Sequence, residues 1–152
     1  MTGRKYLLDT DTLSLFYDNQ RGVQQNLIVN QISNLKNTDQ PIVSVLSIME
    51  LEYSRANAPK SKQAGIQDAI GKIKQTFEVL PVYQNIASHF GMLKAIYKKS
   101  RNLNREQAKK HNIDLMLAAT AITENATLVS ADKIYPKLAE INSALKTEDW
   151  TV

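Results

Sequence analysis

The sequence predicts an α/β fold in which a central parallel sheet of four to five strands is flanked by helices on both faces. Two observations predict it. Short apolar or β-branched runs alternate along the chain with longer segments in which apolar residues recur at helical spacing. The first short run, residues 6–8, is apolar at every position, which is typical of a parallel strand buried on both faces.

Each element of the N-terminal half is predicted from its own pattern. Residues 9–12, Asp-Thr-Asp-Thr, form a loop that ends the first strand and caps a helix beginning near Leu13. Residues 21–36 form an amphipathic helix, because apolar residues recur at Val23, Leu27, Ile28, Ile32 and Leu35. Residues 42–45 are β-branched and form the second strand, and residues 46–56 contain good helix formers.

The C-terminal half continues the alternation. Two further helices are marked by apolar residues at helical spacing, namely Ile66, Ile70, Ile73 and Phe77, and then Ile86, Phe90, Leu93 and Tyr97. Residues 78–82 between them form a brief strand or an extended connection. A polar stretch, residues 100–112, precedes a buried helix at residues 113–124, which is apolar nearly all round. Residues 126–130 are the next strand, and residues 144–146 are an edge strand.

Length and composition set limits on the class of protein. The 152 residues, 43% hydrophobic and 22% charged, fit a single domain over residues 1–152. No apolar run of about 18 residues and no leader-like segment occurs, so we expect a cytoplasmic protein without a membrane segment. Cysteine is absent and histidine occurs twice, which excludes disulfides and thiolate zinc sites. Any metal must therefore be held by carboxylates, which favours Mg²⁺ or Mn²⁺.

The net charge of +4 is unevenly distributed. Residues 94–110 carry seven basic residues and one acidic residue, a net charge of +6, so the remainder of the chain has a net charge of −2. Such a segment indicates binding of a polyanion, because contacts with phosphates supply most sequence-independent affinity. The alternative interpretation is a solvated helix face.

Four acidic residues from separate segments are predicted to meet at one edge of the sheet. Asp9 and Asp132 each follow a strand, and the carboxyl ends of parallel strands share an edge. Asp114 lies in the first turn of a helix that runs back toward the next strand, and Glu50 lies early in the helix after the second strand. Close carboxylates repel each other unless they share protons or bind a cation. The pattern therefore predicts a metal site, and helix capping is the alternative role for each aspartate.

Five short motifs occur in order along the chain. They are residues 6–11 (Tyr-Leu-Leu-Asp-Thr-Asp), 44–53 (Ser-Val-Leu-Ser-Ile-Met-Glu-Leu-Glu-Tyr), 112–119 (Asn-Ile-Asp-Leu-Met-Leu-Ala-Ala), 128–132 (Leu-Val-Ser-Ala-Asp) and 148–150 (Glu-Asp-Trp). In this order and spacing the chain resembles a PIN domain, specifically the VapC-like ribonuclease toxins of bacterial and archaeal toxin–antitoxin pairs. It departs from the usual pattern at Asp11, where Asn is common, at Ser54, where Gly is frequent, and at Ser130, which replaces a common Thr.

The resemblance implies a PIN-like fold and a metal-dependent endoribonuclease that hydrolyses RNA phosphodiester bonds with Mg²⁺ or Mn²⁺. The implied catalytic and metal-binding residues are Asp9, Glu50, Asp114 and Asp132. Asp11 and Ser130 are supporting candidates, and the candidates for contacting the RNA backbone are Lys98, Lys99 and Arg101. The resemblance also implies a homodimer and a small antitoxin protein as its partner.

Three alternatives remain open at this point. Leu-Leu-Asp-Thr-Asp-Thr, residues 7–12, also matches the start of a haloacid-dehalogenase-like phosphatase with Asp9 as nucleophile. That fold needs a lysine segment and another strand with an acidic pair, and only 22 residues follow Ser130. A PIN-like or response-regulator-like module that binds a partner without catalysis is the second alternative. Metal-free RNA cleavage by His89 and His111 is the third, and their wide separation argues against it.

Overall fold

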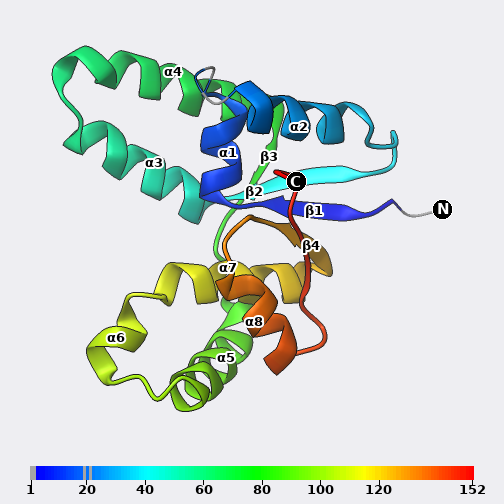
Figure 1. Cartoon of the computed structure of the whole chain (residues 1–152), viewed down its shortest axis with the longest axis vertical. Helices are drawn as coiled ribbons and strands as arrows, with labels where there is room; N and C mark the ends of the chain where they lie inside the picture. The colour runs from blue at the N-terminus through cyan, green and yellow to red at the C-terminus, as the bar shows by residue number, and fades with distance from the viewer. Residues whose placement is uncertain (1–2, 19, 21) are drawn as a thin grey trace.

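The sheet has five parallel strands in the order β3-β2-β1-β4-β5, as a computed structural model of the chain shows for residues 3–18, 20 and 22–152 (Figure 1). The strands are β1 (Lys5–Leu8), β2 (Gln40–Ser44), β3 (Glu78–Leu80), β4 (Ala126–Val129) and β5 (Lys146–Glu148). All four pairings between neighbouring strands are parallel. The predicted α/β fold with its parallel sheet is therefore confirmed.

Helices cover both faces of the sheet, as predicted (Figure 1). One layer contains α1 (Thr10–Phe16), α2 (Gly22–Ser33), α3 (Val45–Asn57) and α4 (Lys60–Thr76). The other contains α5 (Ala87–Ser100), the short α6 (Arg105–Lys109), α7 (Asn112–Glu124) and α8 (Ile134–Ile141), and the 3-10 helix η2 (Gln84–Ile86) leads into it. None of the helices within the described residues is long and apolar enough to cross a membrane.

Successive residues of the central strands feed two separate cores. Leu7 aligns with Ile42 and Leu128, and all three belong to the core beneath α5, α7 and α8. The next residues along the same strands, Leu8, Val43 and Val129, belong to the core beneath α1, α3 and α4. Side chains alternate between the faces of a strand, so a sheet covered on both faces needs apolar residues at every position. This explains the continuous apolar runs that predicted the strands.

The first helix begins earlier than predicted. We expected residues 9–12 to form a loop, and α1 instead begins at Thr10, with Asp9 as its N-cap. Asp9 Oδ1 accepts a hydrogen bond from the Thr12 backbone N–H at 2.8 Å, which satisfies one of the free donors of the first turn. The helix can therefore start directly at the end of β1, and it holds Asp9 at the carboxyl edge of the sheet.

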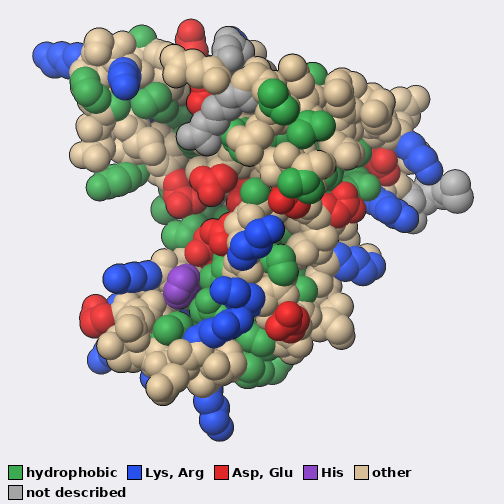
Figure 2. Space-filling model, in the orientation of Figure 1, with side chains coloured by type: hydrophobic (Ala, Val, Ile, Leu, Met, Phe, Trp, Pro, Cys, Tyr) green, Lys and Arg blue, Asp and Glu red, His purple; other side chains and the backbone are tan. Residues whose placement is uncertain are grey.

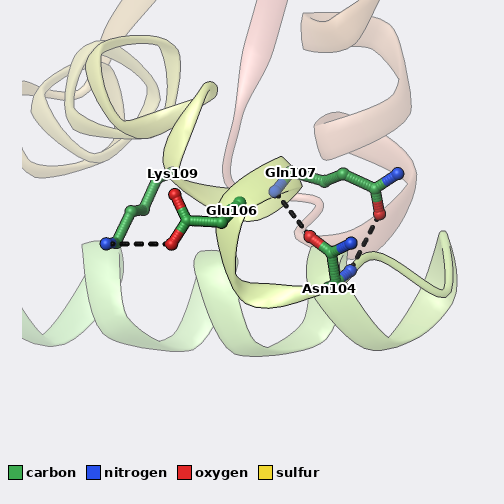
Figure 3. Close-up of polar contacts among 4 residues, drawn as sticks. All are labelled: Asn104, Glu106, Gln107 and Lys109. Carbon is green, nitrogen blue, oxygen red and sulfur yellow. Dashed lines mark hydrogen bonds and ion pairs between the residues drawn. The ribbon is translucent and has the colours of Figure 1, made fainter.

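Two helices were missed, and one strand is displaced. The polar stretch at residues 100–112 contains α6, which a capping box stabilises. Asn104 Oδ1 accepts from the Gln107 N–H at 2.8 Å, and Gln107 Oε1 accepts from the Asn104 N–H at 2.9 Å (Figure 3). An ion pair between Glu106 and Lys109 spans the same turn at 3.3 Å (Figure 3). No element was assigned to residues 134–141, which form α8. The edge strand lies at Lys146–Glu148, two residues beyond the predicted position.

Candidate active site

The four predicted acidic residues line one small pocket at the carboxyl edge of the sheet. The pocket has a volume of about 50 Å³, and its lining consists of Asp9, Thr10, Asp11, Glu50, Asp114, Leu117, Asp132 and Tyr135. Figure 2 shows acidic side chains gathered in the middle of the molecule, between the two layers of helices seen in Figure 1. The structure thus brings together side chains from α1, α3, α7, α8 and the two connections that follow β1 and β4.

Asp9 is the most deeply buried of these acids, with 4% of its surface exposed. Its Oδ1 accepts from the Thr12 N–H, and its Oδ2 accepts from the Ser130 hydroxyl. Burial raises the pKa of Asp9 to about 6; the negative charge of Asp11 adds to this, and the hydrogen bonds from Ser130 and Thr12 oppose it. Ser130 lies directly after β4, so the neighbouring strands β1 and β4 supply the acid and its hydroxyl partner.

Asp114 projects from the first turn of α7 and contacts two side chains. The Tyr135 hydroxyl donates to Asp114 Oδ1 at 3.2 Å, and His111 Nδ1 lies 3.8 Å from Oδ2. Burial raises the pKa of Asp114, and the charges of Asp132 and Glu50 raise it further, while Tyr135 and His111 lower it. The carboxylates of Asp132 and Glu50 therefore lie close enough to Asp114 to disfavour its charged form.

Glu50 and Asp132 are positioned by local hydrogen bonds. The Thr10 hydroxyl donates to Glu50 Oε1 and also lies 3.0 Å from Ser47 Oγ, which joins the start of α1 to α3. Asp132 Oδ1 accepts from the Ile134 N–H at 3.0 Å, and the Asp132 N–H donates to Ser130 Oγ at 3.0 Å. Ser130 therefore connects Asp9 with Asp132, and Asp11 lines the rim as an exposed residue.

The oxygen donors of this pocket match the ligand preference of Mg²⁺ and Mn²⁺. Within the part of the chain that the structure describes, no three His, Asp or Glu side chains are grouped closely enough to surround one cation. Mg²⁺ usually binds through one or two carboxylates and keeps several of its waters, so it does not require an enclosed cage. The donor chemistry of the pocket therefore fits a hydrated cation held at an open site.

The predicted basic residues do not line the pocket. Lys98 and Lys99 lie in the last turn of α5, Arg101 follows that helix, and all three are exposed. This end of α5 is connected to the site, because the Tyr97 ring packs edge to face on His111 at 5.4 Å. The structure therefore places these residues outside the lining of the pocket, and links their helix to the pocket through Tyr97 and His111.

Several residues that shape the site were not among the predicted ones. Tyr135 and Thr10 line the pocket and form hydrogen bonds with its acids. These roles depend on contacts between elements, which the sequence pattern does not show. Lys133 and Lys137 are exposed, four residues apart at the start of α8, and Figure 2 shows basic side chains over this region. These two lysines could have been predicted as candidates from the sequence, because Lys133 directly follows Asp132.

Comparisons with known proteins assign the fold to a family. The family model described as PIN domain matches residues 6–141, which span β2, β3, β4 and all of β1 but its first residue. The chain belongs to the PIN domain family. This match does not favour the haloacid-dehalogenase-like alternative. No curated protein sequence is significantly similar to this PIN domain.

Solved structures share the PIN fold over nearly the whole chain. VapBC2 from Rickettsia felis, bound to a DNA fragment from its promoter, has 21% sequence identity and a TM-score of 0.76, over 96% of this chain and 98% of that one. VapBC-1 from nontypeable Haemophilus influenzae has 22% identity and a TM-score of 0.74, over 97% and 99% of the two chains. FitAcB from Neisseria gonorrhoeae has 18% identity and a TM-score of 0.70, over 95% and 97%.

Proposed function

We infer that this PIN domain is a metal-dependent endoribonuclease and the toxin of a toxin–antitoxin pair. The observation that carries the proposal is the convergence of Asp9, Glu50, Asp114 and Asp132 on one pocket at the carboxyl edge of the sheet. The similar fold of the VapBC structures supports the assignment to a toxin. All four acids are retained, which favours a nuclease over a PIN-like module that only binds a partner.

Different residues of the pocket have different roles in the proposed reaction. A bound Mg²⁺ or Mn²⁺ supplies an acidified water and a positive charge beside the phosphate. Asp9 and Asp114 would hold the cation, and Glu50, oriented by the Thr10 hydroxyl, would complete the site or orient the attacking water. Asp132 would hold a second cation or a water molecule. Ser130 fixes the Asp9 carboxylate through its hydrogen bond to Oδ2.

The proposed partners match the surface of the protein. RNA is the substrate, and the exposed Lys98, Lys99 and Arg101 contact its backbone. A small antitoxin covers the acidic pocket with a basic residue, because the guanidinium fork of arginine pairs well with carboxylates. A homodimer buries the exposed apolar side chains of Met92 and Ile96, which lie one turn apart on α5 and are 55% and 46% exposed.

Brief expression in bacterial cells tests this function. Wild-type protein is expected to stop growth and to create new RNA 5′ ends at a small number of sites, mapped by sequencing of total RNA. Asp114→Asn, which removes one charge but keeps the shape of the side chain, is expected to create none. New ends that form with neither protein would contradict the proposal and favour the non-catalytic binding module. Identical new ends with both proteins would contradict the role of Asp114.

A further inference from the structure

Tyr135 is a buried tyrosine whose hydroxyl reaches the acidic pocket. It is the second residue of α8, is 2% exposed, and is among the largest fully buried side chains of the described chain. Its ring belongs to the core beneath α5, α7 and α8, where phenylalanine would serve equally well for packing. The hydroxyl group therefore needs a separate explanation, because a buried phenolic O–H is costly unless it forms a hydrogen bond.

The partner of that hydroxyl is Asp114. Tyr135 Oη donates to Asp114 Oδ1 at 3.2 Å, and within the described residues no other side chain forms a hydrogen bond with this carboxylate. His111 Nδ1 lies 3.8 Å from Oδ2, which is beyond hydrogen-bonding distance. A phenol O–H is a hydrogen-bond donor and a carboxylate oxygen is an acceptor, so this contact directs the Tyr135 proton at Asp114 Oδ1.

The contact restrains a side chain that would otherwise be mobile. The Asp114 side chain is 33% exposed, so its carboxylate can rotate into solvent when nothing holds it. A hydrogen bond on Oδ1 restricts the rotation of the carboxylate and leaves Oδ2 available to a ligand. Carboxylates that bind metals are commonly held in this way by a second group, and losing that group typically weakens metal affinity 10- to 100-fold.

We propose that Tyr135 is a positioning residue that orients the Asp114 carboxylate for divalent-cation binding. The inference rests on the proposed metal-dependent function and adds a residue from α8 to the site. Tyr135 acts through Asp114 and does not itself contact the cation or RNA. Its loss should therefore change how tightly the cation binds and leave the rate at saturating cation nearly unchanged.

Tyr135→Phe tests this role, because it removes only the hydroxyl and keeps the buried ring. Mn²⁺ alone is titrated into the purified protein by calorimetry, before any RNA is added. The variant is expected to bind Mn²⁺ roughly 10- to 100-fold more weakly than wild type. In a cleavage assay, the Mn²⁺ concentration for half-maximal rate should rise by a similar factor, and the rate at saturating Mn²⁺ should approach that of wild type.

Tyr6→Phe is the matched control. Tyr6 is also buried, at 7% exposed, but its ring packs on Trp150 in the other core and does not line the pocket. This variant should bind Mn²⁺ like wild type. Equal Mn²⁺ affinity in Tyr135→Phe and wild type, or a lower saturated rate at unchanged affinity, overturns the positioning role alone. Wild-type protein that neither binds Mn²⁺ nor cleaves RNA overturns the proposed function as well.

Discussion

At the scale of single residues, two aspartates of the pocket also accept backbone hydrogen bonds at helix starts: Asp9 is the N-cap of α1, and Asp132 directly precedes Lys133, the N-cap of α8. Asp9 accepts the Thr12 N–H at the start of α1, and Asp132 accepts the Ile134 N–H at the start of α8. Capping and ligand binding were alternatives in the sequence, but a carboxylate has enough lone pairs for both. This hydrogen bond holds each carboxylate in one orientation at the pocket. An aspartate that accepts a backbone hydrogen bond at a helix start can therefore also be a ligand of the proposed site.

Burial of Asp9 predicts an unusual dependence of stability on pH. The pKa of Asp9 is about 6 in the folded protein, compared with an ordinary value of 3.8, so the folded state binds the proton more tightly. This contribution to stability is fully present below pH 3.8 and is lost as the pH rises through 6. In EDTA, we expect Asp9 to lower the free energy of unfolding by roughly 1–3 kcal/mol between pH 4 and pH 7.

Urea unfolding of wild type and Asp9→Asn in EDTA measures this effect. Asparagine remains a good N-cap, so α1 should be retained, and the loss of stability between pH 4 and pH 7 should become smaller in the variant. Asp39→Asn is the control. Backbone N–H groups of Arg4 and Lys36 lower the pKa of Asp39, so its titration lies below this pH range. Identical pH profiles for wild type and Asp9→Asn would contradict the assigned pKa.

At the scale of elements, the strands and most helices could be predicted, and the two short helices α6 and α8 could not. β1, β2 and β4 are buried on both faces, which produces continuous apolar runs. α6 has only five residues, so its periodicity is too short to detect, although its capping residues were visible in the sequence. α8 begins within a polar segment and contains Pro136, which a helix tolerates in its first turn.

The position of α8 predicts a contribution to RNA binding. Lys133 and Lys137 are exposed near its start, next to a residue that lines the pocket. Each phosphate contact contributes about 0.7 to the slope of log affinity against log salt for single strands. The double variant Lys133→Gln/Lys137→Gln should therefore flatten that slope by about 1.4 for a single-stranded RNA, as measured by fluorescence anisotropy.

Two other lysine pairs serve as a second test and as a control for the salt dependence of RNA binding. Lys98→Gln/Lys99→Gln tests the pair on α5 that the sequence indicated, and a flatter slope is expected there as well. Lys60→Gln/Lys62→Gln, at the start of α4, removes the same charge away from the pocket and should leave the slope unchanged. Equal slopes in wild type and the α8 variant would show that α8 does not contact the RNA backbone.

At the scale of the whole molecule, the topology assembles the pocket. Strand order β2-β1-β4 places the ends of three strands side by side, so segments more than 100 residues apart, such as those of Asp9 and Asp132, converge on one edge. This convergence could be predicted, because it follows from parallel strands alone. The hydrogen bonds of Thr10 to Glu50 and of Tyr135 to Asp114 could not, because they depend on how α3 and α8 pack.

The most direct test is cleavage of a purified RNA with and without a divalent cation. Wild-type protein should cleave in Mn²⁺ or Mg²⁺, stop when EDTA is added in excess, and resume when excess Mn²⁺ is restored. Asp9→Asn, which keeps the cap of α1, should not cleave under any of these conditions. Cleavage that continues in EDTA, or that Asp9→Asn carries out at the wild-type rate, would contradict a metal-dependent nuclease site at the carboxyl edge of the sheet.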